Sequence, residues 1–363
     1  MRTATSLLVI ALMCTSCYVR IGGSRSSVKY DDAIDFETFV RPVENGLGDG
    51  YYPSKFQIIS GTEGIIAGYN GENTAIFVTS DGGKNWRKKA QFPKVYCESL
   101  QNSRDRAYCH FFNIETLENE RIMSSEGDYS IWETILEDEH TIKNFKAFGN
   151  GVLMAQLPVP ETNSTVSGRK YYSVLSKDYG KTWQKTEPYL NLPRTLSYTA
   201  EDVIYVPDST VSEIARFNPV TFQNDTIYNS KELIIEIVGG EDIVGLWEGH
   251  RTNFYQISGN QMKFLSSIYD RRHPLRNYTP DELHQHGDTL YTSITPLTYM
   301  GKRTTYISTD KAQTWREVNA GKATDEKYNP RVTIYYKDRI VSYCVVEKDG
   351  RRQDFIRIIR PKS

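Results

Sequence analysis

The feature that most constrains the fold is a repeat of short apolar strands, each preceded by turn residues. Their starts lie about 40 to 51 residues apart, which is the period of four-stranded propeller blades. The seven strands begin near Ile65, Ala107, Val152, Val203, Ile243, Leu290 and Ile340. The repeat therefore predicts an all-β chain folded as a β-propeller of about seven four-stranded blades. Spacing alone does not fix the closure, so six or eight blades remain open alternatives.

The last blade needs a strand from the N-terminal part of the chain. After Arg339 only two more strands fit before the chain ends, the second of them in QDFIRIIR. We expect the segment around Tyr30 to Val40 to complete the last sheet, because closing the ring removes exposed sheet edges.

A second repeat is an eight-residue motif, found as TSDGGKNW at 79–86, SKDYGKTW at 176–183 and STDKAQTW at 308–315. Each copy follows a strand-like run, which predicts a tight turn within a hairpin. In such a turn, Ser, Thr and Asp side chains accept backbone hydrogen bonds, Gly supplies a positive φ, and Trp packs as an anchor. The residues expected to build the turns are Thr79, Asp81, Gly83, Trp86, Ser176, Asp178, Gly180, Trp183, Ser308, Asp310 and Trp315. We expect the tryptophans at equivalent positions on successive or alternate blades, and a longer, degraded fourth copy at 124–132.

These motifs resemble the Asp box of bacterial neuraminidase repeats, found in sialidases, sortilin ectodomains and photosystem II assembly factors. The resemblance implies a propeller and raises an alternative function, a sialidase-like glycoside hydrolase. The sialidase pattern implies Arg-Ile-Pro, a first-blade Asp, a Tyr and Glu pair, and three Arg that hold the substrate carboxylate. Here Arg41 stands directly before Pro42 without the Ile, the first-blade acid is missing, and Tyr335 and Tyr336 fit an ordinary strand. We therefore expect no catalytic residues and no enzyme.

The N-terminus has the order of a secretory signal: Arg2, an apolar run from Leu7 to Met13, and small residues before Cys17. This predicts a signal peptide at 1–16, a tether at 17–28 and one propeller domain at 29–363. The cleavage region resembles a bacterial lipobox, which implies lipidation of Cys17 and a place in the bacterial cell envelope, facing the periplasm. Cleavage without lipidation stays open, because Cys14 stands where such motifs usually have Leu.

Export also places the remaining cysteines in an oxidising compartment. Cys97 and Cys109 lie symmetrically about Ser103 in what reads as a hairpin, so we expect a disulfide between cross-strand partners. Cys344 lies in an apolar run, which is typical of a buried thiol.

Charge and motifs exclude several classes of function. The 44 basic and 45 acidic residues nearly balance, so nucleic acid is not an expected partner. The basic cluster at 271–276 is interrupted by Pro274 and reads as a solvated loop. His284, His286 and Asp288 suggest a metal arrangement, but two ligands on a polar loop do not make a site. We expect no metal and no cofactor.

A rigid ring that presents many loops suits binding of another macromolecule. The sequence therefore predicts an anchored propeller that binds a partner protein. Two roles fit, an immunity lipoprotein that neutralises a secreted toxin such as a lipase effector, and an assembly factor for an envelope complex.

Overall fold

The computed structural model describes residues 36–361 except 49, 104–105, 160–170, 187–194, 208–211, 249–250, 269–277, 297–303, 319–328 and 349–350. The signal peptide, Cys17, the tether and the basic cluster at 271–276 lie outside the described residues. They stay predictions.

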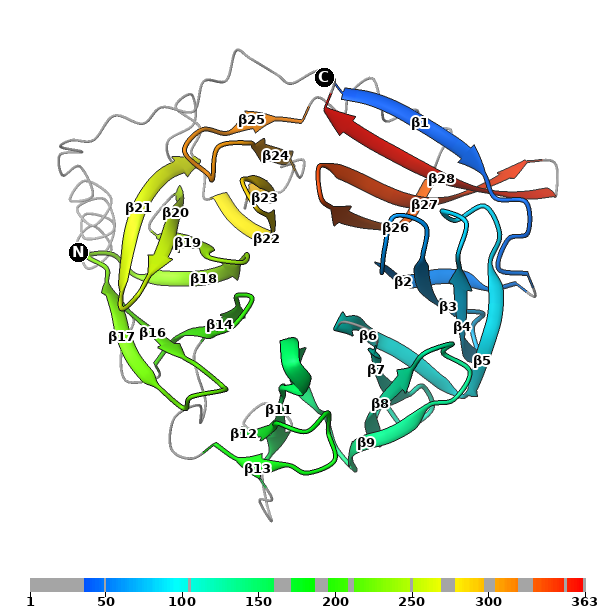
Figure 1. Ribbon diagram of the computed structural model, residues 1–363, viewed down its shortest axis with the longest axis horizontal. Coiled ribbons are helices and arrows are strands. Elements are labelled where there is room, and N and C mark those ends of the chain that lie inside the picture. The colour runs from blue at the N-terminus through cyan, green and yellow to red at the C-terminus, as the bar shows by residue number, and fades with distance from the viewer. Residues whose placement is uncertain are drawn as a thin grey trace, which may run out of the picture.

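Seven four-stranded antiparallel sheets form the blades of a β-propeller (Figure 1). Blade 1 contains β2 (Tyr52–Ile58), β3 (Gly64–Tyr69), β4 (Asn73–Thr79) and β5 (Arg87–Pro93). Blade 2 contains β6 (Val95–Ser103), β7 (Arg106–Asn113), β8 (Glu120–Glu126) and β9 (Glu133–Asp138). Blade 3 contains β10 (Lys143–Ala147), β11 (Leu153–Pro158), β12 (Tyr171–Ser176) and β13 (Gln184–Lys185). Blade 4 contains β14 (Thr195–Tyr198), β15 (Val203–Val206), β16 (Glu213–Phe217) and β17 (Asn224–Asn229).

The remaining blades follow the same order from the ring centre outward. Blade 5 contains β18 (Ile234–Gly239), β19 (Ile243–Glu248), β20 (Arg251–Ser258) and β21 (Gln261–Ile268). Blade 6 contains β22 (Tyr278–His286), β23 (Thr289–Pro296), β24 (Thr304–Ser308) and β25 (Arg316–Glu317). Blade 7 contains β26 (Asn329–Tyr336), β27 (Arg339–Lys348), β28 (Arg351–Pro361) and, outermost, β1 (Phe36–Pro42). The predicted seven blades are thereby confirmed.

Two details of the sequence analysis are confirmed with them. The seven repeated apolar runs are the second strands of the seven blades, β3, β7, β11, β15, β19, β23 and β27. The N-terminal strand does close the ring, because β1 pairs antiparallel with β28 and sets Arg41 opposite Ile356. In Figure 1 the blue β1 lies beside the red β28, so the first and the last described strands share one blade.

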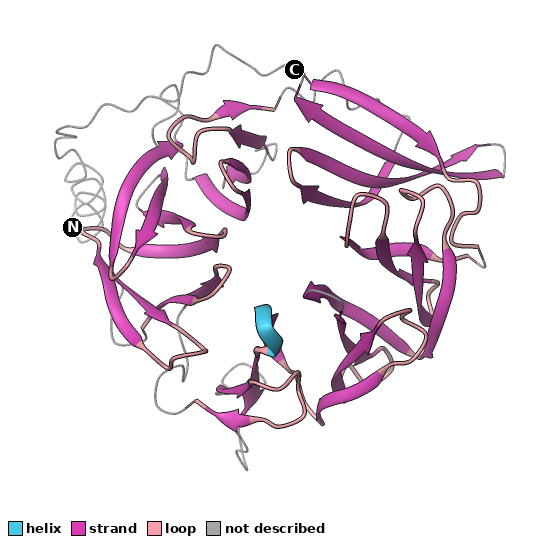
Figure 2. Cartoon of the chain, in the orientation of Figure 1, coloured by secondary structure: helices cyan, strands magenta, loops and turns pink. Residues whose placement is uncertain are grey.

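Helix is nearly absent from the described residues, as Figure 2 shows. The one element of this kind in them is the short 3-10 helix η1 (Gly149–Gly151) at the entrance to β11. No helix among the described residues is long and apolar enough to cross a membrane.

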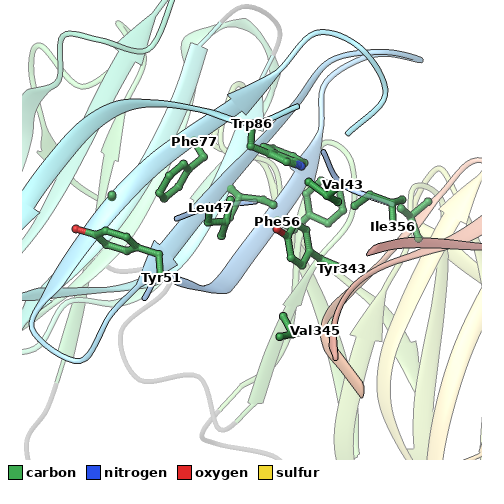
Figure 3. Packing of buried hydrophobic residues seen from close by; sticks show 12 residues of the cluster. Val43, Leu47, Tyr51, Phe56, Phe77, Trp86, Tyr343, Val345 and Ile356 are labelled. Atoms are coloured by element: carbon green, nitrogen blue, oxygen red, sulfur yellow. The ribbon is translucent and has the colours of Figure 1, made fainter. Parts of the chain in front are cut away.

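The hydrophobic core is divided among the joints between neighbouring blades. At the joint of blades 7 and 1, Phe56, Trp86, Tyr343 and Ile356 are almost fully buried in one cluster (Figure 3). Similar clusters join blades 1 to 2 and 5 to 6. A sheet with two apolar faces can bury both of them only between two other sheets, so each blade depends on its neighbours.

Glutamine side chains of the innermost strands form hydrogen bonds to the neighbouring blade. Gln57 of blade 1 donates to the carbonyl oxygen of Leu100 at 3.0 Å, and Gln101 of blade 2 donates to that of Phe145 at 2.8 Å. The Gln285 carbonyl accepts the backbone N–H groups of residues 241, 242 and 243 at 2.9 to 3.1 Å. These bonds satisfy polar backbone groups near the ring centre, where the innermost strands have no further strand to pair with.

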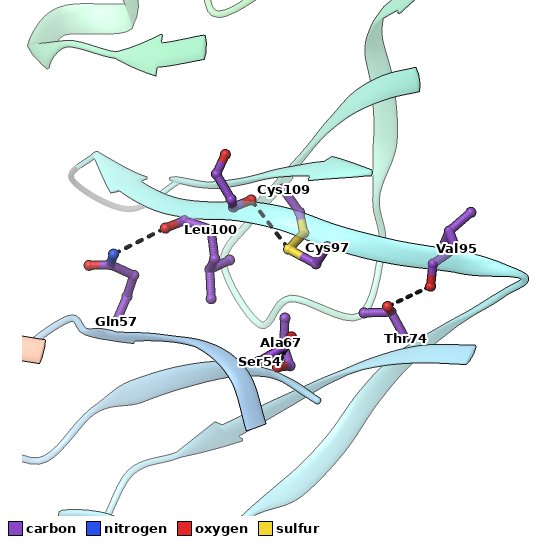
Figure 4. The surroundings of a disulfide bond; sticks show 9 residues. Ser54, Gln57, Ala67, Thr74, Val95, Cys97, Leu100 and Cys109 are labelled. Atoms are coloured by element: carbon purple, nitrogen blue, oxygen red, sulfur yellow. Dashed lines mark hydrogen bonds between the residues drawn. A yellow bond between two sulfur atoms is a disulfide. The ribbon is translucent and has the colours of Figure 1, made fainter. Parts of the chain in front are cut away.

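The predicted disulfide between Cys97 and Cys109 is present, with Cα atoms 6.3 Å apart (Figure 4). The expected register was wrong, because the two cysteines are not directly opposite. Cys97 faces Phe111 and Cys109 faces Leu100, with a bulge in β6 after Cys97. The bulge brings the two cysteines within bonding distance although they are diagonal neighbours on the two strands. Counting residues outward from the centre of the hairpin does not reveal such a bulge. Cys344 is a free, buried thiol, and burial raises its pKa.

Candidate functional site

The ring has two ends, which carry different connections. Because antiparallel strands alternate in direction, the connections between first and second strands and between third and fourth strands lie at one end. We call this the turn end, and the opposite end, where blades connect to each other, the loop end. The three repeated motifs all lie between a third and a fourth strand, in blades 1, 3 and 6, and therefore at the turn end.

The aspartates of the three motifs accept hydrogen bonds inside their own turns. In blade 1, the Asp81 carboxylate accepts from the backbone N–H of Asn85 at 3.0 Å, from its side-chain amide at 2.8 Å and from the Thr79 hydroxyl at 2.8 Å. The same bonds recur in blades 3 and 6, between Asp178, Thr182 and Ser176 and between Asp310, Thr314 and Ser308. Burial alone would raise the pKa of Asp81, but the bonds from Asn85 and Thr79 outweigh it and hold the pKa at about 2. These carboxylates are thus committed to the turns.

The fifth position of each motif takes a left-handed backbone. The φ angles are 87° at Gly83, 91° at Gly180 and 60° at Ala312. Each N–H donates to the first hydroxyl of its motif, at 3.0, 2.8 and 2.9 Å. Glycine adopts this backbone without steric cost and alanine does not, so at its fifth position the blade 6 motif carries strain that the other two lack.

The tryptophans of the motifs pack on the preceding blade. The Trp183 indole donates to the carbonyl of Ile135 in blade 2 at 2.7 Å, and the Trp315 indole donates to the Ser266 hydroxyl in blade 5 at 3.0 Å. Trp86 contacts Tyr343 of blade 7, with ring centroids 6.2 Å apart. The positions within a blade are equivalent, as expected, but the blades are the first, third and sixth. The expectation of successive or alternate blades holds from blade 6 to blade 1 and from blade 1 to blade 3, and was wrong from blade 3 to blade 6.

The loop end of blade 2 is different, because it is strongly acidic. Seven carboxylates meet three cationic side chains there: Glu98, Glu115, Glu118, Glu120, Glu137, Asp138 and Glu139 against Lys94, Arg121 and Lys143. The chain as a whole has a net charge of only -1. Carboxylates therefore outnumber the cationic side chains at this part of the ring.

A buried histidine and glutamate pair lies beneath this acidic surface. His110 on β7 and Glu120 on β8 are both almost inaccessible, and the His110 Nε2 lies 2.7 Å from the Glu120 Oε2. The same carboxylate oxygen accepts the backbone N–H of Ile142 at 2.8 Å, at the entrance to blade 3. Glu120 thus joins the second and third strands of blade 2 to the first strand of blade 3. Loss of either side chain would leave a buried polar group without its partner.

An exposed leucine projects from the connection between β7 and β8. Leu117 is 66% exposed and has a φ of 56°. The connection is ordered by local bonds, since the Leu117 N–H donates to the Asn113 carbonyl and the Glu115 N–H donates to the Asn113 side chain, both at 2.9 Å. A leucine in the left-handed region is strained, and such strain persists where the surroundings enforce it. The loop therefore holds an apolar side chain out in water.

Leu117 borders a surface hollow of about 580 Å³ between blades 2 and 3. Its lining combines charged and aromatic side chains, among them Glu98, Phe112, Lys143 and Tyr198. Asn144 lies in it with a φ of 51°, at a bulge of β10, and its carbonyl accepts the hydroxyl hydrogen bond of Tyr198 from blade 4. The hollow is thus framed by three blades.

The disulfide lies directly behind this hollow. Glu98 follows Cys97 on β6 and His110 follows Cys109 on β7, and both line the hollow. The two cysteines are fully buried in the core between blades 1 and 2 (Figure 4). The bridge therefore ties together the two strands that supply the hollow's wall.

The remaining candidates from the sequence do not converge. His284 stacks on Tyr335 with centroids 4.5 Å apart, while the His286 Nδ1 lies 3.9 Å from a carboxylate oxygen of Glu241. Within the part of the chain that the structure describes, no three His, Cys, Asp or Glu side chains group as metal ligands. Arg41 and Tyr336 line a second, smaller hollow between blades 7 and 1 at the turn end.

Sequence reasoning missed the acidic hollow altogether. A usable signal was present in the segment IETLENE at 114–120, where three glutamates surround a leucine between two strands. The pairing of His110 with Glu120 and the approach of blade 3 had no such signal, because they depend on how blades pack.

The comparisons with known proteins concern the fold. No protein family and no curated protein matches the sequence. Among solved structures, an uncharacterized protein from Listeria monocytogenes is 11% identical, with a TM-score of 0.55 over 86% of this chain and 97% of its own. Oligogalacturonate lyase from Vibrio parahaemolyticus is 10% identical, with a TM-score of 0.55 over 90% of this chain and 97% of its own. Acylaminoacyl peptidase from Pyrococcus horikoshii is 12% identical, with a TM-score of 0.54 over 84% of this chain and 53% of its own.

These structures correct one expectation and leave another without support. A lyase and a peptidase stand among the similar folds, which overturns the expectation that this chain is not an enzyme. The match spans about half of the peptidase, and at these identities the likeness extends to the fold alone. The sialidase alternative gains no support, since no family matches. The comparisons therefore show that this chain shares a β-propeller fold with these structures.

Proposed function

We propose that this protein binds a partner protein through the loop end of blades 2 and 3. The observation that carries the proposal is Leu117, an apolar side chain held 66% exposed on an ordered loop. Exposed apolar groups on rigid frames bind with little ordering cost, and they serve as anchors when a partner offers a pocket.

The charge around Leu117 defines the chemistry of the partner. Glu115 and Glu118 are exposed next to Leu117 on the same connection, and Glu139 is exposed on the connection to blade 3. Glu115 also pairs with Lys94 at 2.9 Å. A partner surface with Lys or Arg side chains around an apolar pocket complements this charge. Opposite charge raises the association rate, and the gain falls with salt. A specific complex should bury at least about 1,000 Å² in total, which extends beyond the hollow to neighbouring loops.

The identity of the partner is also part of the proposal. An immunity role would require a secreted toxin with a basic surface, and an assembly role would require a component of an envelope complex. We propose anchoring at a lipidated Cys17 in the bacterial cell envelope, facing the periplasm, which brings the propeller close to both classes. The shared bonds in blades 1, 3 and 6 support the further proposal that the repeated turns are Asp boxes.

The test of the binding proposal is an affinity measurement on the isolated complex. The tagged mature chain is used to purify its partner, and the Kd is measured over a range of salt concentrations. Replacement of Glu115, Glu118 and Glu139 by Gln together should weaken binding about tenfold at low salt and flatten its salt dependence.

A matched control removes three exposed glutamates from the turn end. Glu133→Gln, Glu201→Gln and Glu317→Gln change the net charge equally and should leave the Kd unchanged. Equal weakening by both triple variants would mean that net charge, rather than the loop end of blade 2, governs binding, and the proposal would fail.

The anchor is tested separately. Cys17→Ser should abolish lipid labelling and release the protein from membranes, because a bound lipid chain supplies the membrane affinity. Unchanged membrane partitioning would refute the lipoprotein proposal and leave the binding proposal intact.

A further inference from the structure

The smaller hollow at the turn end lies at the joint where the ring closes. It has a volume of about 220 Å³ and is lined by side chains of blades 7 and 1. The segment between β1 and β2 connects the two blades, and side chains of both blades pack together at the joint. A molecule bound here would contact both partners of the closure.

The inner wall of this hollow is apolar. Phe56, Trp86 and Ile356 belong to the buried cluster at the joint, and Figure 3 shows them between the strands of blade 1 and those of blade 7. Ile58 and Ile358 also line it and are only partly buried. Part of the apolar wall is therefore open to a ligand.

The rim of the hollow carries two guanidinium groups, one of which, that of Arg339, also pairs with Asp338. Arg41 on β1 and Arg339 on β27 line it, and one carboxylate, that of Glu63, lines it with them. Arg41 Nη1 lies 3.9 Å from the position that a Cβ on Gly82 would take, so its guanidinium lies against the first repeated turn. The Arg339 Nε donates to Asp338 at 3.0 Å, which leaves its two terminal nitrogens for another anion. Guanidinium groups bind carboxylates in preference to neutral groups.

We propose that this hollow binds a small amphipathic monoanion, a short-chain carboxylate whose head lies between Arg41 and Arg339 and whose chain lies on Ile58 and Ile358. The volume equals that of about seven water molecules at roughly 30 Å³ each, which suits an acid of the size of hexanoate. The proposal is independent of partner binding at the loop end. Because the ligand would contact blades 7 and 1 together, its binding stabilises the closed ring.

The test combines calorimetric titration with thermal unfolding of the mature chain. Hexanoate should bind with a Kd of about 1 mM or tighter, and at ten times that Kd it should raise the unfolding temperature by about 2 °C. Hexanol and hexylamine have the same chain length, but hexanol is neutral and hexylamine is a cation. Both should bind at least about tenfold more weakly than hexanoate.

Variants then locate the site. Arg41→Gln and Arg339→Gln should each weaken hexanoate binding at least about fivefold and leave hexanol binding unchanged, whereas Arg87→Gln, outside the hollow, should change neither. Glu63→Gln should strengthen hexanoate binding, since it removes the one carboxylate of the rim. No saturable hexanoate binding, equal binding of hexanol, or insensitivity to both arginines would each overturn the proposal.

Discussion

The two ends of the propeller use polar residues in opposite ways. At the turn end, the carboxylates of Asp81, Asp178 and Asp310 are satisfied within turns that repeat almost atom for atom. At the loop end of blade 2, the carboxylates crowd around an exposed leucine, Leu117, on a turn whose local bonds recur in blade 4 around Asn218. The turn-end motif uses its polar groups to stabilise the ring, whereas the loop end of blade 2 leaves Leu117 and Glu118 exposed to a partner.

The turn end itself contains an instructive difference. A Cβ added to Gly180 would lie 2.7 Å from the Cδ1 of Ile135 in the preceding blade, whereas blade 6 has Ala312 at the equivalent place. There the preceding blade presents Ser266, whose hydroxyl donates to the Ala312 carbonyl. A small neighbour on the adjacent blade thus accommodates the larger residue.

The largest expected effect follows from that contact. Gly180→Ala should lower the free energy of unfolding by about 2–4 kcal/mol. The new Cβ would clash with Ile135, and alanine would also be strained in the left-handed backbone of this position. Gly127→Ala, whose added Cβ would have no neighbour within 4 Å, should cost only about 1 kcal/mol. Denaturant unfolding measures both, and equal losses would show that the contact with Ile135 does not matter.

Removal of the disulfide is the next effect in size, and it links stability to the loop end. The double variant Cys97→Ser, Cys109→Ser should lose about 2–3 kcal/mol of unfolding free energy, since the bridge closes a loop of 12 residues. It should also weaken partner binding, because Glu98 and His110 adjoin the cysteines. Cys344→Ala is the control and should leave partner affinity unchanged. Full affinity in the double variant would mean that the hollow does not need the bridge.

A smaller effect is a loss of stability in acid from the turn end. The folded pKa of Asp81 is lowered to about 2 from an ordinary value of 3.8, and the pKa values of Asp178 and Asp310 are lowered as well. A lowered folded pKa contributes stability above the unfolded pKa and loses it as pH falls through the folded one. The free energy of unfolding should therefore fall between about pH 4 and pH 2, and less steeply in Asp81→Asn. An identical slope would contradict the turn assignment.

The difference between the turn end and the loop end also decides how much of each could be predicted from the sequence. Local periodicity recurs along the chain, and it predicted three features. These are the beginnings of the repeated strands near Ile65 and Ile340, the turns and the closing strand. The register of Cys97 was not predictable, since one bulge shifts the pairing by a residue. The contact of Glu120 with Ile142 was also unpredictable, because it forms only when two blades pack.

The most direct measurement of the central claim compares two exposed apolar residues at opposite ends of blade 2. Leu117 at the loop end is 66% exposed and Ile131 at the turn end is 74% exposed, so each can be changed to Asn with little effect on folding. Asparagine also tolerates the left-handed backbone of Leu117. If the loop end binds the partner, Leu117→Asn should raise the Kd at least about tenfold and Ile131→Asn should leave it unchanged. A raised Kd for Ile131→Asn with normal binding by Leu117→Asn would contradict the account and assign binding to the turn end.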